Sequence, residues 1–231
     1  MANSPRAPER ATPFSTLVSR PASEWPTLHA IVDVEVCNRA GWDPADYAAA
    51  LLDGGATFLQ IRAKQMGSSA FLELCDAVVD RAAHYAATII VNDRVDLAVL
   101  SGASGVHVGQ DDLGVGDARR LLGAEAIVGR STHTPEQIVA AVLTDPTYIA
   151  VGPVFGTTTK DTGYAAVGLD LVREARRVTD KPVVAIGGVT LANALAAIEA
   201  GATMVAVISD LLAGDTPAAR VREYHDRLPR S

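Results

Sequence analysis

The feature of this sequence that most limits its fold is a repeated alternation between short apolar runs and longer amphipathic segments. Some short runs, such as residues 89–91 and 183–186, are continuously apolar, which is typical of parallel strands covered on both faces. The longer segments repeat apolar residues at helical spacing, as Phe71, Leu74 and Val78 do. We therefore expect strands and helices to alternate around one parallel sheet.

The pattern predicts eight strands, which span residues 28–34, 57–62, 88–92, 105–109, 126–131, 148–152, 182–187 and 204–208. Helices are expected to begin at Asp43-Pro44, Thr134-Pro135 and Thr216-Pro217, where a capping oxygen precedes a proline. Residues 27–231 thus fit an α/β fold of one domain, the (β/α)8 TIM barrel. A doubly wound open sheet is the alternative, and the missing Gly-rich dinucleotide fingerprint counts against it.

The amino-terminal residues 1–26 differ from the rest, because four prolines lie among polar residues with little periodicity. This composition predicts a flexible N-terminal extension. A mitochondrial transit peptide is the alternative, and Glu9 and Glu24 disfavour it, since such peptides are poor in acids.

Charge and hydropathy restrict the partners of the chain. A net charge of -7 at pH 7 argues against a surface that binds DNA or RNA. No apolar run reaches the roughly 18 residues that a membrane span needs, and a secretory stretch is missing. With only two cysteines, Cys37 and Cys75, far apart in the sequence, we expect reduced thiols and a cytoplasmic location. The chain is expected to bind small molecules and neither nucleic acid nor membrane, and the sequence leaves a homo-oligomer open.

Cationic side chains mark the end of the second predicted strand. Gln60, Arg62 and Lys64 alternate with Ile61 and Ala63, so the polar residues share the side that faces the barrel mouth, where active sites of this fold lie. Two cations in a cavity are costly without an anion, and guanidinium and ammonium groups together suit a diphosphate. The alternative is that both simply reach solvent at the strand end.

Carboxylates follow the next two strands. Asn92-Asp93 ends the third strand, and Asp111-Asp112 follows the fourth. Carboxylates at the mouths of neighbouring strands can share Mg2+, which binds through one or two carboxylates plus substrate phosphates. The alternative is that these aspartates cap the helices that follow.

Phosphate-binding chemistry is concentrated after the later strands. The loop after the sixth strand carries hydroxyls and an ammonium, at Thr157, Thr158, Thr159 and Lys160. Barrels often bind phosphate with the loops after strands seven and eight, where Gly188 and Ile208-Ser209 lie. An ordinary polar loop is the alternative for residues 157–160.

Other polar residues complete the mouth. Ser131 ends the fifth strand and can hydrogen-bond a ligand, whereas His107 is better explained as a satisfied core histidine than as a general base. No Ser-His-Asp set, zinc spacing or Schiff-base lysine lies at a strand end. The two phosphate-directed regions indicate two phosphorylated substrates.

Several segments occur in one order along residues 28–212. They are Gln60-x-Arg62-x-Lys64, Val91-Asn92-Asp93, Gly105-Val106-His107-Val108-Gly109-Gln110-x-Asp112, Gly129-x-Ser131-x-His133-Thr134, Gly152-Pro153-Val154-Phe155 with Thr157-Thr158-Thr159-Lys160, and Ile186-Gly187-Gly188-Val189. With them the chain resembles the thiamine phosphate synthase (thiamine-phosphate pyrophosphorylase) family. The resemblance implies a transferase that joins 4-amino-2-methyl-5-hydroxymethylpyrimidine diphosphate to hydroxyethylthiazole phosphate, by dissociative substitution with loss of diphosphate.

The resemblance also implies a role for each matching residue. The pyrimidine diphosphate would contact Gln60, Ile61, Arg62, Ala63, Lys64, Asn92, Ser131 and Lys160. The thiazole phosphate would contact Thr157, Thr158, Thr159, Gly188, Ile208 and Ser209. Asp93 and Asp112 would bind Mg2+, and Arg62, Lys64, Ser131 and Lys160 would be catalytic.

Departures from the family pattern leave rivals to weigh. Ala63 and Gly156 replace residues common in the family, and the segment 35–39 after the first strand is unusual. A thiazole tautomerase and a non-catalytic thiazole phosphate binder are the alternatives, but neither needs a cation and Mg2+ set. An isomerase or synthase of tryptophan or histidine biosynthesis shares only the phosphate-binding loops.

Overall fold

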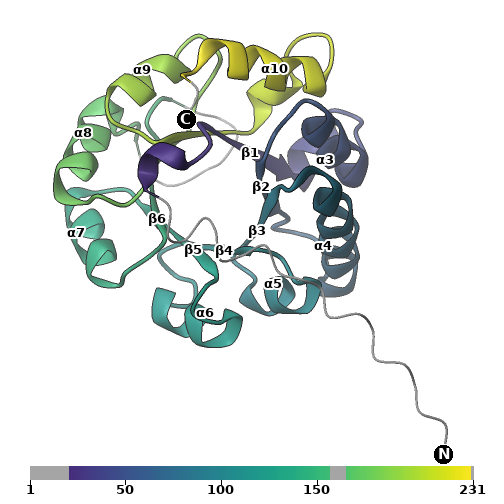
Figure 1. Ribbon diagram of the computed structural model, residues 1–231, viewed down its shortest axis with the longest axis horizontal. Helices are drawn as coiled ribbons and strands as arrows, with labels where there is room; N and C mark the ends of the chain where they lie inside the picture. The colour runs from purple at the N-terminus through teal and green to yellow at the C-terminus, as the bar shows by residue number, and fades with distance from the viewer. Residues whose placement is uncertain (1–20, 157–164, 230–231) are drawn as a thin grey trace, which may run out of the picture.

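The computed structural model describes residues 21–156 and 165–229, and its strands form a closed parallel barrel (Figure 1). The strands pair in chain order, and β8 closes on β1. They are β1 (Leu28–Asp33), β2 (Phe58–Arg62), β3 (Thr88–Asn92), β4 (Gly105–Val108), β5 (Ile127–Thr132), β6 (Tyr148–Val151), β7 (Val183–Ile186) and β8 (Met204–Val207). The predicted (β/α)8 TIM barrel is confirmed.

Helices surround the barrel and alternate with its strands (Figure 1). The α-helices are α2 (Val34–Arg39), α3 (Pro44–Asp53), α4 (Ser68–Ala82), α5 (Val95–Ser101), α6 (Val115–Leu122), α7 (Pro135–Leu143), α8 (Gly168–Val178), α9 (Ala194–Glu199) and α10 (Pro217–Arg227). Short 3-10 helices are η1 (Ala22–Glu24), η2 (Ala83–Tyr85) and η3 (Ser209–Leu212). The three predicted proline starts are confirmed, because Asp43, Thr134 and Thr216 cap α3, α7 and α10 through their side chains.

The apolar residues form two separate clusters on the two faces of the closed sheet. The larger cluster lies between strands and helices, and on β1 it takes Leu28, Ala30 and Val32. The smaller cluster fills the barrel interior, where β1 contributes Ile31. Alternation along each strand sorts side chains between these clusters, so every second residue near a strand end is directed toward the mouth.

The amino-terminal end of the barrel is closed by an aromatic residue that the sequence assigns to a flexible segment. The Trp25 side chain is 2% exposed, and its ring lies 5.7 Å from that of Phe58 and 6.3 Å from that of Tyr148. Because Phe58 and Tyr148 begin β2 and β6, Trp25 forms the floor of the barrel. The predicted boundary at residue 26 is therefore corrected to a position before Trp25, and residues 1–20 lie outside the described residues.

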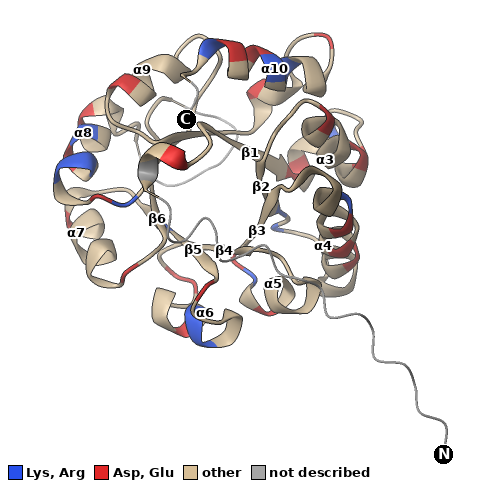
Figure 2. Ribbon diagram, in the orientation of Figure 1, with Lys and Arg blue, Asp and Glu red and all other residues tan. Residues whose placement is uncertain are grey.

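Charged residues are spread over the outside of the barrel. Figure 2 shows Lys and Arg interspersed with Asp and Glu on α6, α8 and α10. Within residues 21–156 and 165–229, none of the helices combines the length and the apolar character that a membrane span requires.

Both cysteines are buried free thiols, which leads to a testable expectation. Burial is the main cause that raises the pKa of Cys37 and of Cys75 to about 12, and the charge of Asp33 adds to the effect at Cys37. Only about one thiol in ten thousand is then ionised at pH 8. We expect an aromatic disulfide reagent at pH 8 to label neither cysteine in the folded protein, and to label both in denaturant. A cysteine that reacts rapidly without denaturant would contradict this burial.

Candidate active site

The two cations at and just after the end of β2 lie between carboxylates at the ends of the neighbouring strands β1 and β3. Asp33 stands opposite Arg62 in the register of β1 and β2, and Arg62 Nη1 donates a hydrogen bond to Asp33 Oδ2. Lys64 Nζ donates to Asp93 Oδ2, just after β3. The Asp33 and Arg62 side chains are only 2% and 12% exposed, whereas Lys64 is 46% exposed. Arg62 is thus held inside the mouth, and Lys64 lies at its rim.

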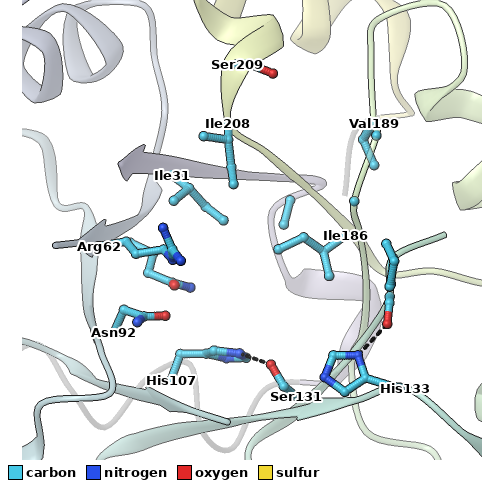
Figure 3. A pocket seen from close by; sticks show the side chains of 16 residues that line it. Ile31, Arg62, Asn92, His107, Ser131, His133, Ile186, Val189, Ile208 and Ser209 are labelled. Atoms are coloured by element: carbon cyan, nitrogen blue, oxygen red, sulfur yellow. Dashed lines mark hydrogen bonds between the residues drawn. The ribbon is translucent and has the colours of Figure 1, made fainter. Parts of the chain in front are cut away.

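A cavity opens at the carboxyl ends of the strands (Figure 3). Its wall contains the predicted substrate-binding residues Gln60, Arg62, Asn92, Ser131, Gly188, Ile208 and Ser209. Figure 3 shows Arg62 and Asn92 on one side and Ile186 and Val189 on the other. Strands from several parts of the chain therefore direct these seven residues toward one space, whereas Lys64, Asp93 and Asp112 do not line it.

A hydrogen-bonded group crosses the middle of the barrel below this cavity. His107 Nε2 lies 2.7 Å from Ser131 Oγ, and His107 Nδ1 lies 3.0 Å from the Tyr148 hydroxyl (Figure 3 shows the first contact). The rings of His107 and Tyr148 stack at 5.6 Å. The prediction of a satisfied core histidine agrees with these bonds, but His107 also borders the cavity and fixes the Ser131 hydroxyl.

Gln60 is held from below by a second histidine. Its Nε2 lies 3.2 Å from His29 Nε2, and both side chains are buried. Burial, and then the charge of His107, lowers the pKa of His29 to about 3, so His29 is neutral and can accept this hydrogen bond. The amide of Gln60 is therefore fixed in orientation at the inner end of the cavity.

The carboxylates of Asp93 and Asp112 meet beside the mouth. Asp112 Oδ2 accepts from Gly109 N at 2.7 Å. Burial raises the pKa of Asp112, and a hydrogen bond with Asp93 and the charge of Asp93 raise it further. The helix-capping alternative fails for Asp93, since the N-cap of α5 is Arg94 and makes no side-chain cap. The two carboxylates together form a pair of hard oxygen donors.

This pair suits a divalent cation that takes its remaining ligands from elsewhere. In the part of the chain that the structure describes, no cluster of three or more His, Cys, Asp or Glu forms a complete metal site. Mg2+ commonly binds through one or two carboxylates and keeps waters or substrate phosphates as its other ligands. Asp93 and Asp112 therefore fit Mg2+ at the edge that also carries Lys64.

The opposite side of the cavity presents backbone rather than charge. Gly187 and Gly188 adopt φ of 95° and 64°, and a Cβ on Gly188 would lie 2.4 Å from the carbonyl oxygen of Gly156. Asn193 Nδ2 donates to Gly188 O at 2.9 Å. Asp210 Oδ2 accepts from Leu191 N and from Arg220, which ties the loop after β7 to η3. The glycines thus let the loop after β7 pass close to Pro153, Phe155 and Gly156 after β6, and side chains behind them hold the loop.

Two of the predicted substrate contacts require correction, and four others involve residues that the structure does not describe. Ile61 is completely buried between strands and helices, and the half-buried Ala63 packs against the same cluster. Their predicted substrate contacts are corrected for the side chains, because strand alternation turns both away from the cavity. Thr157, Thr158, Thr159 and Lys160 lie outside the described residues.

Two acidic residues of the mouth were missed by the sequence analysis. Asp33 holds Arg62, and Glu35 Oε1 accepts from Lys64 N at 2.9 Å and from Gln65 N at 3.0 Å. The period of two that directs Ile31 inward also directs Asp33 inward, so this signal was present in the sequence. Glu35 lies on a helix turn, and strand alternation carries no information about its partner.

Comparison with known proteins relates this chain to one family. The family model described as thiamine monophosphate synthase matches residues 28–211. The thiamine-phosphate synthase of Koribacter versatilis (strain Ellin345) is 44% identical over 204 residues, covering 86% of this chain and 94% of the relative. That of Albidiferax ferrireducens is 40% identical over 187 residues, covering 80% and 85%.

Solved structures agree with this relation. A thiamine phosphate pyrophosphorylase from Pyrococcus furiosus superimposes with a TM-score of 0.79 at 27% identity, covering 89% of this chain and 96% of the other. A 3-hexulose-6-phosphate synthase has a TM-score of 0.63 at 16% identity, covering 88% and 100%. The second likeness, at such low identity, reflects the barrel fold alone.

Gly129 provides a test of the packing beneath the cavity. It stands opposite Tyr148 in the register of β5 and β6, and a Cβ there would lie 2.1 Å from the tyrosine ring. We expect Gly129→Ala to lower the free energy of unfolding by about 1–3 kcal/mol, because the ring must move. Gly116→Ala is the control, since a Cβ at this exposed helix position meets nothing within 4 Å. Equal unfolding curves for both variants in urea would contradict the tight contact.

Proposed function

This chain belongs to the thiamine monophosphate synthase family, and we propose that it joins 4-amino-2-methyl-5-hydroxymethylpyrimidine diphosphate to hydroxyethylthiazole phosphate. It is a transferase, and the products would be thiamine phosphate and diphosphate. The observation that carries this proposal is the division of one cavity into a cationic edge and a glycine-rich edge. Arg62 lines the first edge, with Lys64 at its exposed rim, and Gly187 and Gly188 line the second.

The cationic edge suits the diphosphate leaving group. In the proposed step, the C–O bond between the pyrimidine methylene and diphosphate breaks, and its electron pair leaves on the diphosphate oxygen. Arg62 and Lys64 can stabilise the charge that grows on this oxygen, and Lys160 has the same proposed role from outside the described residues. Since Arg62 is already held by Asp33, little reorganisation is needed when the charge develops.

The other edge would hold the nucleophile. The lone pair of the thiazole ring nitrogen forms the new C–N bond to the pyrimidine methylene, which gives a thiazolium product. The protein therefore needs no nucleophilic side chain of its own. Backbone at Gly188 and the residues Ile208 and Ser209 would fix the thiazole phosphate, so that the nitrogen points at the methylene.

The pyrimidine ring would lie between these edges, on the inner wall of the cavity. Gln60, Asn92 and Ser131 present polar groups there, and Ile31 and Ile186 supply apolar surface. Gln60 is fixed by His29 and Ser131 by His107. Such fixed polar groups can orient a heteroaromatic ring, and the apolar residues limit the water that could trap the electrophile.

Asp93 and Asp112 would hold Mg2+ in this proposal. The ion would supply positive charge to the leaving diphosphate. The proximity of the two carboxyl groups, through which Asp93 raises the pKa of Asp112, supports the assignment, because like groups this close favour a shared proton or cation. Lys64, which is bonded to Asp93, stands beside the same position.

The proposed function is tested by mixing both heterocycles with Mg2+ and the purified chain. We expect diphosphate release to depend on the thiazole phosphate and to match thiamine phosphate formation one to one. Phosphate-specific detection after pyrophosphatase treatment, together with chromatography of the product, measures both. Diphosphate release at the same rate without the thiazole phosphate would reject the transferase, and proton exchange on the thiazole alone would favour the tautomerase.

Asp93 can be tested separately through metal binding. We expect Asp93→Asn to weaken Mg2+ affinity in the presence of inorganic diphosphate about tenfold or more, since one of two charged ligands is lost. Isothermal titration measures this affinity without turnover. Asp111→Asn is the matched control, because Asp111 is an exposed neighbour of Asp112. If both variants bind Mg2+ as the unaltered chain does, Asp93 lies outside the metal shell.

A further inference from the structure

We propose that the turn after β1 positions the cationic edge of β2, with Asp33 positioning the Arg62 guanidinium and Glu35 positioning the backbone that carries Lys64. Both would be positioning residues, because they act on the cations rather than on the substrate. This inference rests on the proposed function, since it takes Arg62 and Lys64 as the groups that meet the diphosphate.

Asp33 uses both of its oxygens in fixed directions. Its Oδ1 accepts from Val36 N at 3.0 Å and so caps α2, while its Oδ2 accepts from Arg62 Nη1. With a side chain only 2% exposed, the carboxylate has little freedom to turn. A buried charged hydrogen bond of this kind fixes the direction of a guanidinium more strongly than an exposed one. The start of α2 therefore sets where Arg62 stands.

The bond to Asp33 leaves most of the guanidinium for another anion. Arg has five N–H donors in a planar group, and Asp33 occupies only Nη1. The Arg62 Nε is buried and has no hydrogen-bond partner within the described residues. Because Arg62 also lines the cavity, a phosphate oxygen can bond to guanidinium donors that Asp33 leaves free, without displacing Asp33.

Glu35 acts on the other cation through the main chain. One oxygen, Oε1, accepts from the amides of Lys64 and Gln65, at 2.9 and 3.0 Å. Burial opposes the ionisation of Glu35. The pKa of Glu35 is nevertheless held below its ordinary value, because the carboxylate is stabilised by the backbone amides of Glu35, Gln65 and Lys64 and by the charge of Arg62. Glu35 is therefore a carboxylate near neutral pH, bonded to the point where the chain leaves β2.

The contacts made by Asp33 and Glu35 matter because Arg62 and Lys64 must lie close to the oxygen of the diphosphate on which negative charge develops. Lys64 has a long side chain with an exposed end, so its reach depends on where its backbone is held. A displacement of about 1 Å in a positioning group can reduce turnover about a hundredfold. The turn after β1 fixes one cation by its side chain and the other by its backbone, which places both on one edge.

Asp33→Asn tests the first contact. Asparagine is as good an N-cap as aspartate, so α2 keeps its cap while Arg62 loses its counter-charge. We expect kcat/KM for the pyrimidine diphosphate to fall about 10- to 100-fold, with the KM for thiazole phosphate changed less than about twofold. Tighter binding of inorganic diphosphate or unchanged kinetics would overturn the role, because Asp33 would then compete with substrate for Arg62.

Glu35 provides a second test, because its half-buried position tolerates substitution better than the buried position of Asp33. We expect Glu35→Ala to lower kcat about three- to tenfold, and Glu35→Gln to recover most of this loss, because an amide oxygen still accepts from both backbone amides. A loss in Glu35→Gln as large as in Glu35→Ala would overturn a positioning role through these amides. If Asp33→Asn fails to fold, the comparison of Glu35→Ala with Glu35→Gln tests the proposal.

Asp43→Asn is the matched control for both. The Asp43 carboxylate also accepts from two backbone amides, Ala45 N at 2.8 Å and Asp46 N at 3.1 Å, but it caps α3 away from the cavity. We expect its kinetics to equal those of the unaltered chain, and thermal melts of all variants separate stability from positioning. Equal kinetic losses in Asp43→Asn would assign the effect to stability and overturn the inference.

Failure of this inference is distinguishable from failure of the proposed function. If the unaltered chain does not form thiamine phosphate, the proposed function is wrong whatever the variants do. Binding of inorganic diphosphate with Mg2+ to the unaltered chain and to Asp33→Asn, measured by titration, still tests the positioning. Turnover by the unaltered chain with identical diphosphate binding and kinetics in the variants would reject the inference alone.

Discussion

A cation can stand inside the mouth of this barrel only where a carboxylate shares its surroundings, because the cavity wall removes much of the water that would otherwise solvate it. Arg62, at the end of β2, is such a buried cation and pairs with Asp33 from β1. The exposed Lys64, two residues further along the chain, pairs with Asp93 just after β3. Parallel closure brings these strand ends together. The charge pattern of the site is therefore as much a product of strand order as of residue type.

The interior below the site changes from apolar to polar along the barrel axis. Trp25, Phe58 and Tyr148 pack at the floor, and the polar pairs of His29 with Gln60 and His107 with Ser131 lie above them. Polar side chains buried in this way must satisfy one another, and mutual bonding fixes their orientations. The aromatic floor thus gives rigid support to the groups that face a ligand.

Much of the fold was predictable because it depends on local pattern. Every predicted strand lies within two residues of the observed one, and the period of two correctly sent Gln60 and Arg62 into the mouth. The burial of Trp25 was not predictable, since a single aromatic residue in a Pro-rich segment shows no periodicity. The predicted substrate contact of Ile61 came from a contiguous segment that the resemblance implies, although strand alternation directs the Ile61 side chain toward the helices. The partners of Arg62 and Lys64 depend on barrel closure, which no local pattern specifies.

The aromatic floor also decides how the chain enters the barrel. Pro21 borders the same groove as Thr147 and Pro182, the residues that come just before β6 and β7, so the described chain begins on the face opposite the cavity. A purification handle or a fused partner joined directly at Pro21 would consequently be attached on the side of the molecule opposite the substrate opening.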